Sequence, residues 1–104
     1  MNKTRRKDLE RIKEGLEEVK NEIEQLTERM EELKSDLESV KDEEETAYDN
    51  LPESLQEGER GERMQEAVDN MEEAVDGFDS VVDSIQEAVQ GFEDIYNSID
   101  AAVG

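Results

Sequence analysis

The sequence predicts an all-α protein: a long antiparallel helical hairpin of coiled-coil type with a short proline-containing turn, which dimerises into a four-helix bundle. Three observations lead to this fold class. Two stretches carry an uninterrupted seven-residue hydrophobic repeat, and its alternating steps of three and four are typical of helices that pack against helices. The two stretches are nearly equal in length. The only proline, Pro52, lies in the break between them.

The first repeat predicts a helix over residues 1–47, which begins with a basic tip. We label the seven positions of the repeat a to g and call the residues at one position along a helix a column. The a column is Leu9, Leu16, Ile23, Met30 and Leu37, and the d column is Ile12, Val19, Leu26, Leu33 and Val40. The e column beside this seam is mostly basic: Lys13, Lys20, Thr27, Lys34 and Lys41. The b column is wholly acidic and is expected to face solvent: Glu10, Glu17, Glu24, Glu31 and Glu38.

The break covers residues 48–58 and contains a short capping turn at about residues 52–56. The ring of Pro52 suits the first turn of a helix but not a helix interior. Gly58 and Gly61 mark the beginning of the second helix, which is predicted over residues 59–104. Two long helices joined by so short a break predict an antiparallel pair.

The second repeat runs from Met64 to Val103 through eleven acidic residues and no basic one. With Val68 at position a, its e column is Gln65, Glu72, Asp79, Gln86 and Glu93. The e edges of two antiparallel helices face each other, so the lysines of the first helix would meet the carboxylates of the second. Each exposed pair stabilises by only a few tenths of a kcal/mol, so the pairs select orientation more than they add stability.

The second helix has a further apolar line that one hairpin cannot cover. Its g column is entirely apolar, and the neighbouring c column holds only small uncharged residues. Such a face suits the close approach of a second helix, so we expect a homodimer in which this helix packs against its copy. The alternative is that Gly77 and Gly91 lie on an exposed face and have no packing role. The expected dimer face is Ala67, Ala74, Gly77, Val81, Ala88, Gly91 and Ile95.

Composition narrows the classes of function. The net charge of −20 should repel nucleic acid and anionic membranes and attract basic protein surfaces. There is no His or Cys, and no phosphate-binding loop or EF-hand spacing, so we expect no enzyme, no cofactor and no metal site. No apolar run approaches the roughly 18 residues of a membrane span, and nothing resembles a signal-peptide core. A soluble cytoplasmic protein is therefore expected.

The segment Ala47-Tyr-Asp-Asn-Leu-Pro-Glu-Ser-Leu-Gln56, followed by Glu59-Arg-Gly-Glu62 and the Met64–Val89 repeat, resembles a recurrent group of small acidic coiled-coil proteins of bacteria and their phages. The resemblance covers roughly the second half of the chain, and its most specific part is the break around Pro52. It implies a phage or mobile-element origin, which would place the protein in the host cytoplasm. It implies no catalytic residues.

Two functions remain open. In the first, the chain is an acidic decoy, similar in composition to small anti-CRISPR and anti-restriction proteins. A dimer would carry about −40 over about 65 Å, roughly one charge per 1.6 Å, against about 1.7 Å in duplex DNA. In the second, it is a structural coiled-coil spacer, scaffold or assembly chaperone whose acidity serves solubility. The expected partner-binding surface of the decoy is the b column of the first helix with Asp69, Asp76 and Asp83.

Overall fold

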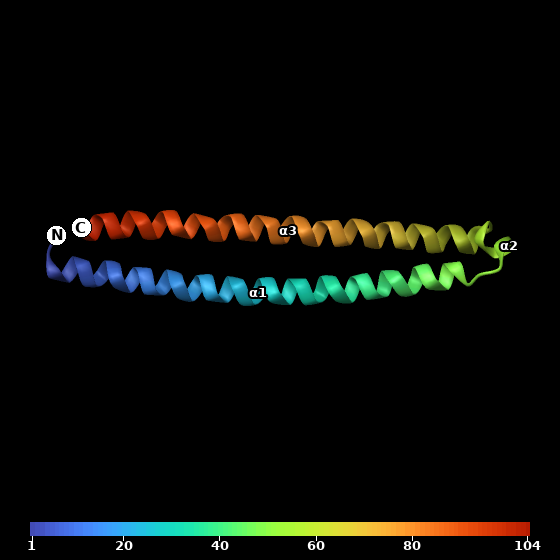
Figure 1. Ribbon diagram of the computed structural model, residues 1–104, viewed down its shortest axis with the longest axis horizontal. Helices are drawn as coiled ribbons and strands as arrows, with labels where there is room; N and C mark the ends of the chain where they lie inside the picture. Colours follow the sequence, from blue (N-terminus) through green and yellow to red (C-terminus); the bar gives the residue numbers. More distant parts are fainter. The chain divides into compact units, whose positions relative to one another are not determined.

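The computed structural model describes residues 1–104 and is helical, with no strand (Figure 1). It has three helices: α1 (Lys3–Asp49), α2 (Glu53–Gln56) and α3 (Glu59–Val103). The predicted all-α class is confirmed. None of the three helices is both long and apolar enough to cross a lipid bilayer.

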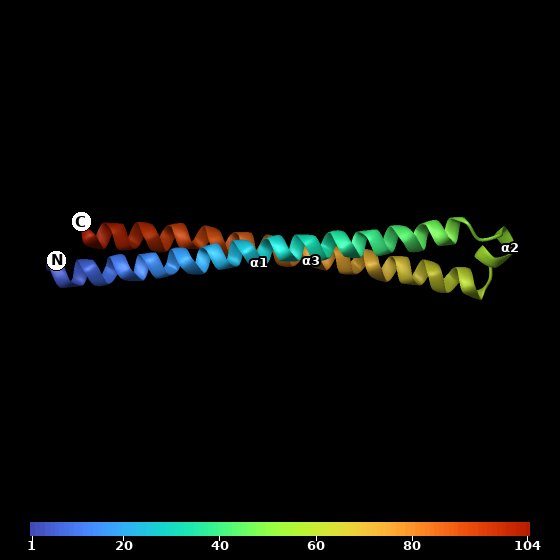
Figure 2. The same ribbon diagram turned by 90° about the horizontal axis from the view of Figure 1, so that it is seen from below.

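The chain divides into two compact units, and each contains a segment of α1 beside a segment of α3. We call Arg29–Val81 the turn unit, because it contains α2. We call Met1–Glu28 together with Val82–Gly104 the terminal unit, because it contains both chain ends. In both views of the ribbon, the two helix segments of each unit lie side by side (Figure 2).

The helix boundaries follow from local chemistry. The Asn2 side chain accepts a hydrogen bond from the backbone N–H of Arg5 at 2.9 Å, as an N-cap residue does, and α1 begins at the next residue. The sequence places the break from Tyr48 onward, but α1 continues to Asp49, so Tyr48 keeps a helical position. At the start of α3, Glu59 complements the positive end of the helix dipole.

The turn between the long helices is fixed by Gln56, the last residue of α2. Its side-chain amide donates a hydrogen bond to the carbonyl of Tyr48 at 2.9 Å, which ties α2 to the end of α1. Its backbone lies directly against Gly61, the buried glycine in the first turn of α3. Pro52 occupies the N-cap position of α2 without any side-chain cap. Together these contacts position the first turn of α3 relative to the end of α1.

The inner face of α3 follows the predicted repeat. Its a and d residues are all buried or half-buried, and the most buried are Val82 and Tyr96. The ring of Tyr96 meets Phe92 edge-on at a centroid distance of 6.5 Å. The Lys13 ammonium lies 5.9 Å from the centre of the Tyr96 ring. The Tyr96 hydroxyl is buried without a hydrogen-bond partner.

The inner face of α1 differs from the predicted a/d seam. Its half-buried residues are those of the a and e columns together with Glu38 and Glu45 of the b column, so lysines stand where the second apolar column was expected. The side chains of Lys13, Lys20, Lys34 and Lys41 are only 20% to 34% exposed, so their aliphatic stems are largely covered while their ammonium groups reach carboxylates at the edge. The d column is exposed instead, with 44% to 60% of each residue's surface accessible. The prediction of an a/d seam is therefore wrong for α1 and correct for α3.

Candidate functional site

A line of ion pairs joins the e columns of α1 and α3 in each unit. In the terminal unit, the ammonium of Lys13 lies 2.7 Å from the carboxylate of Asp100, and Lys20 lies 3.8 Å from Glu93. In the turn unit, Lys34 pairs with Asp79, and Lys41 lies 3.7 Å from Glu72. Each step of seven residues forward in α1 matches a step of seven back in α3. The helices are thus antiparallel within each unit, and the predicted pairing of the e columns is confirmed.

The predicted partner-binding carboxylates flank these ion pairs. Position b lies only about 60° around a helix from position e, so the b columns of α1 and α3 border the ion pairs from either side. All of the predicted carboxylates are exposed except that of Glu38, which is half-buried. We call the ion pairs and the two flanking rows the acidic edge. Its b-column carboxylates are Glu10, Glu17, Glu24 and Asp83 in the terminal unit, and Glu31, Glu38, Glu45, Asp69 and Asp76 in the turn unit.

Negative charge is concentrated in the turn unit. This unit has nineteen acidic and five basic residues, a net charge of −14, whereas the terminal unit has thirteen and seven, a net of −6. A basic partner would therefore be attracted most strongly to the turn unit.

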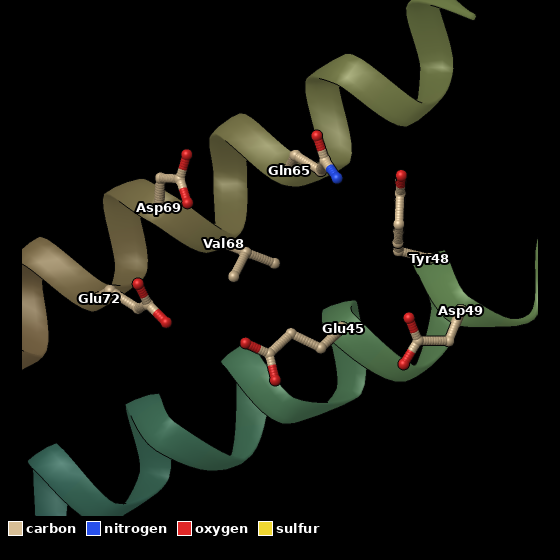
Figure 3. A pocket seen from close by; sticks show the side chains of 7 residues that line it. All are labelled: Glu45, Tyr48, Asp49, Gln65, Val68, Asp69 and Glu72. Atoms are coloured by element: carbon tan, nitrogen blue, oxygen red, sulfur yellow. The ribbon is translucent and has the colours of Figure 1, made fainter. Parts of the chain in front are cut away.

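The acidic edge of the turn unit is hollowed at its end, beside Tyr48 (Figure 3). Here the e column of α1 has Tyr48 instead of a lysine, and α3 presents Gln65 opposite it. The Tyr48 ring extends from α1 toward α3 (Figure 3). The hollow has a volume of about 440 Å³. Its lining consists of Glu45, Tyr48, Asp49, Gln65, Val68, Asp69 and Glu72.

Most b-column carboxylates of the edge have no ion-pair partner, and the hollow differs from the rest of the edge in its e position, where Tyr48 replaces a lysine and the nearest lysine is one heptad away. Lys41 reaches Glu72, but no basic group forms an ion pair with Glu45, Asp49 or Asp69. The hollow therefore combines three unneutralised carboxylates with the ring of Tyr48. Carboxylates and an aromatic face are the groups that bind a guanidinium or an ammonium ion.

A second hollow, of about 520 Å³, lies on the acidic edge of the terminal unit. It occurs at Thr27, the other e position of α1 without a lysine, and faces Gln86. Glu24 and Glu28 border it on α1. Neither hollow was predicted, although Thr27 and Tyr48 interrupt the lysine column in the sequence at these two places. Nowhere in the chain do three His, Cys, Asp or Glu side chains converge closely enough to hold a metal ion.

Two lysines of the edge have raised pKa values. A hydrogen bond to Asp100 raises the pKa of Lys13 above its usual 10.5, and the carboxylate of Asp79 does the same to the pKa of Lys34. A raised pKa means that the folded chain binds the proton more tightly than the unfolded chain. The stability that these lysines contribute is thus fully present below pH 10.5 and is lost as the pH rises through their folded-state pKa values.

We therefore expect the double variant Lys13→Arg and Lys34→Arg to resist alkaline unfolding better than the wild type. Arginine keeps its charge at pH 11.5, so both ion pairs persist there. The melting temperature, measured by circular dichroism, should fall between pH 9 and pH 11.5 in both proteins but fall less in the variant. An equal fall in both would show that these pairs do not contribute to alkaline stability.

Most of the predicted dimer face is exposed, and of its seven residues only Ala67 and Gly91 are half-buried. A Cβ atom added to Gly77 or to Gly91 would meet nothing within 4 Å. Val81 and Ile95 are 46% and 43% exposed. The remaining members are Ala67, which is half-buried, and Ala74 and Ala88, which are exposed.

Comparisons of the chain with protein-family models, with curated proteins and with solved structures return no match.

Proposed function

We propose that the chain is a non-enzymatic, acidic protein-interaction module of phage or mobile-element origin that binds a basic protein surface. The observation that carries this proposal is the hollow at Tyr48, where Glu45, Asp49 and Asp69 have no basic partner within the chain. A protein that used its acidity only for solubility would have no need to group unneutralised carboxylates around an aromatic ring. An arginine or lysine side chain of a partner fits this arrangement.

The architecture that goes with this function is a continuous antiparallel hairpin that forms a homodimer. Ion pairs of the same register in both units support the hairpin. The exposed apolar g column of α3 supports the dimer. As expected from the sequence, α3 would lie against α3 of the second copy in a four-helix bundle.

The sharpest form of the function is an inhibitor that mimics nucleic acid and occupies the basic channel of a host or defence protein, as an anti-CRISPR protein does. The acidic edge supplies the regular rows of carboxylates that such mimicry needs, and the turn unit supplies the greatest charge. Binding between surfaces of opposite charge should weaken steeply as salt is added.

The test is competition with a fluorescent DNA duplex for a basic RNA-guided nuclease, at 50 and 300 mM NaCl. The wild type should displace the duplex at low salt, and Glu45→Lys with Asp69→Lys should weaken displacement about tenfold or more. The matched control is Glu32→Lys with Glu73→Lys, which changes the net charge equally in the same unit but away from the acidic edge.

Equal losses in both double variants would mean that only overall charge matters and that the hollow is not a binding site. Displacement that is indifferent to salt would contradict mimicry. If the wild type displaces no duplex and captures no basic protein from a host lysate, the alternative of a structural spacer, scaffold or assembly chaperone is favoured.

A further inference from the structure

The d column of α1 is a line of large apolar side chains, each with about half of its surface exposed. In the terminal unit, Ile12, Val19 and Leu26 are 54%, 44% and 60% exposed. In the turn unit, Leu33 and Val40 are 46% and 51% exposed. Isolated exposed apolar residues are ordinary, but a contiguous line of them marks an interaction surface.

This column lies on the same side of each unit as the apolar g column of α3. In α1 the inner face lies between a and e, so d is turned roughly 80° away from it on the side opposite e. In α3 the inner face lies between a and d, so g is turned about 90° away, again opposite e. Because the e columns meet on one side, d of α1 and g of α3 meet on the other.

Each unit therefore carries an apolar face opposite its acidic edge. The face of the terminal unit consists of Ile12, Val19, Leu26, Ala88, Ile95 and Ala102. The face of the turn unit consists of Leu33, Val40, Ala67, Ala74 and Val81.

We propose that these apolar faces are the docking surface for a second copy of the chain, and that α1 contributes its whole d column to the interface. The inference rests on the homodimer of the proposed function and changes its geometry. The second copy would cover both helices of the pair, rather than α3 alone.

The distribution of charge favours a second copy as the occupant. The c column that borders the face on α3 has no charged residue, in a chain of which 42% is charged. A face made for a basic partner would carry carboxylates, and those line the opposite edge. A face made for its own copy must lack them, since identical charges would meet. The uncharged c column consists of Asn70, Gly77, Ser84, Gly91 and Ser98.

Spacing also fits a second copy. The face repeats every seven residues, so a second copy offers side chains with the matching period. The open space at Gly77 and Gly91 lets another helix approach closely, which gives these glycines a packing role that the single chain does not supply.

Sedimentation equilibrium of the full chain between 1 and 100 µM tests the proposal. The wild type should be a dimer, and Leu26→Glu or Leu33→Glu alone should raise the dimer dissociation constant at least 100-fold. Both side chains are exposed in the single chain, so circular dichroism should show that the monomeric variants remain helical. The matched control is Asn21→Glu with Ser35→Glu, in the f column of α1, which should leave the dimer intact.

A wild type that is monomeric at 100 µM would overturn the proposal, as would variants that remain dimeric. If Ile95→Glu abolishes the dimer but Leu26→Glu and Leu33→Glu do not, the interface lies on α3 alone. The salt dependence distinguishes dimerisation from the proposed binding to a basic partner. Salt screens the repulsion between two chains that each carry a net charge of −20, so it should strengthen the dimer. The same screening should weaken binding to a basic partner. A dimer that displaces no DNA would overturn only the proposed function.

Discussion

Replacement of Gly61 by alanine is expected to destabilise the chain by about 2 kcal/mol, although alanine is the better helix former. A Cβ atom at this position would lie 2.7 Å from the Cα atom and 2.5 Å from the carbonyl carbon of Gln56, and closer still to the carbonyl oxygen. These are backbone atoms, so no side-chain rotation relieves the contact. The chain must instead move α2 away from α3, which would break the hydrogen bond between Gln56 and Tyr48.

The measurement is thermal unfolding followed by circular dichroism, in which a loss of this size should lower the melting temperature by roughly 10 °C. Gly15→Ala is the control. A Cβ atom at Gly15 meets nothing within 4 Å, so this variant should gain about 1 kcal/mol from helix propensity alone. A melting temperature of Gly61→Ala at or above the wild-type value would show that the turn does not need this close approach.

Leu37→Glu should destabilise the folded chain by about 3 kcal/mol, whereas Val40→Glu should change its stability by less than about 0.5 kcal/mol. Leu37 belongs to the a column and is half-buried against α3, so a carboxylate there loses solvation without a partner. Val40 belongs to the d column and is 51% exposed, so a carboxylate there stays in water. An a/d seam would make the two losses nearly equal.

Urea denaturation at a concentration at which sedimentation shows only monomer would separate these cases, because Val40 also belongs to the proposed dimer interface. Equal destabilisation of both monomeric variants would contradict an inner face of a and e residues. Asp42→Lys in the f column controls for a change of charge near the end of α1 and should have little effect.

The acidic edge and the apolar face lie on opposite sides of each unit, so the two proposed interactions do not compete. A dimer formed through the apolar faces would leave the hollow at Tyr48 open to a basic side chain. Dimerisation would also double the number of acidic edges, and two sites on one assembly bind a repetitive basic surface more tightly than one site does.

The heptad pattern was enough to predict the helices and the ion-pair edge. A seven-residue repeat of strong helix formers leaves no competing secondary structure, and Pro52 with the glycines after it locates the break. Lysines at e positions of one helix and carboxylates at those of the other predict which edges meet, because charge pairing depends on column identity alone. The confirmed pairs Lys13–Asp100 and Lys41–Glu72 follow directly from that pattern.

The rotation of α1 about its own axis, in contrast, could not be predicted from that pattern. The repeat identifies a and d as apolar, but a lysine stem covers apolar surface as well as leucine does once its ammonium reaches a carboxylate at the edge. Rotation toward e therefore removes the d column from the inner face and exposes Leu26 and Leu33. The hollow at Tyr48 and the contact of Gly61 with Gln56 likewise could not be predicted from the sequence pattern. Both depend on the distance between segments far apart in the sequence, and a pattern along one helix contains no information about that distance.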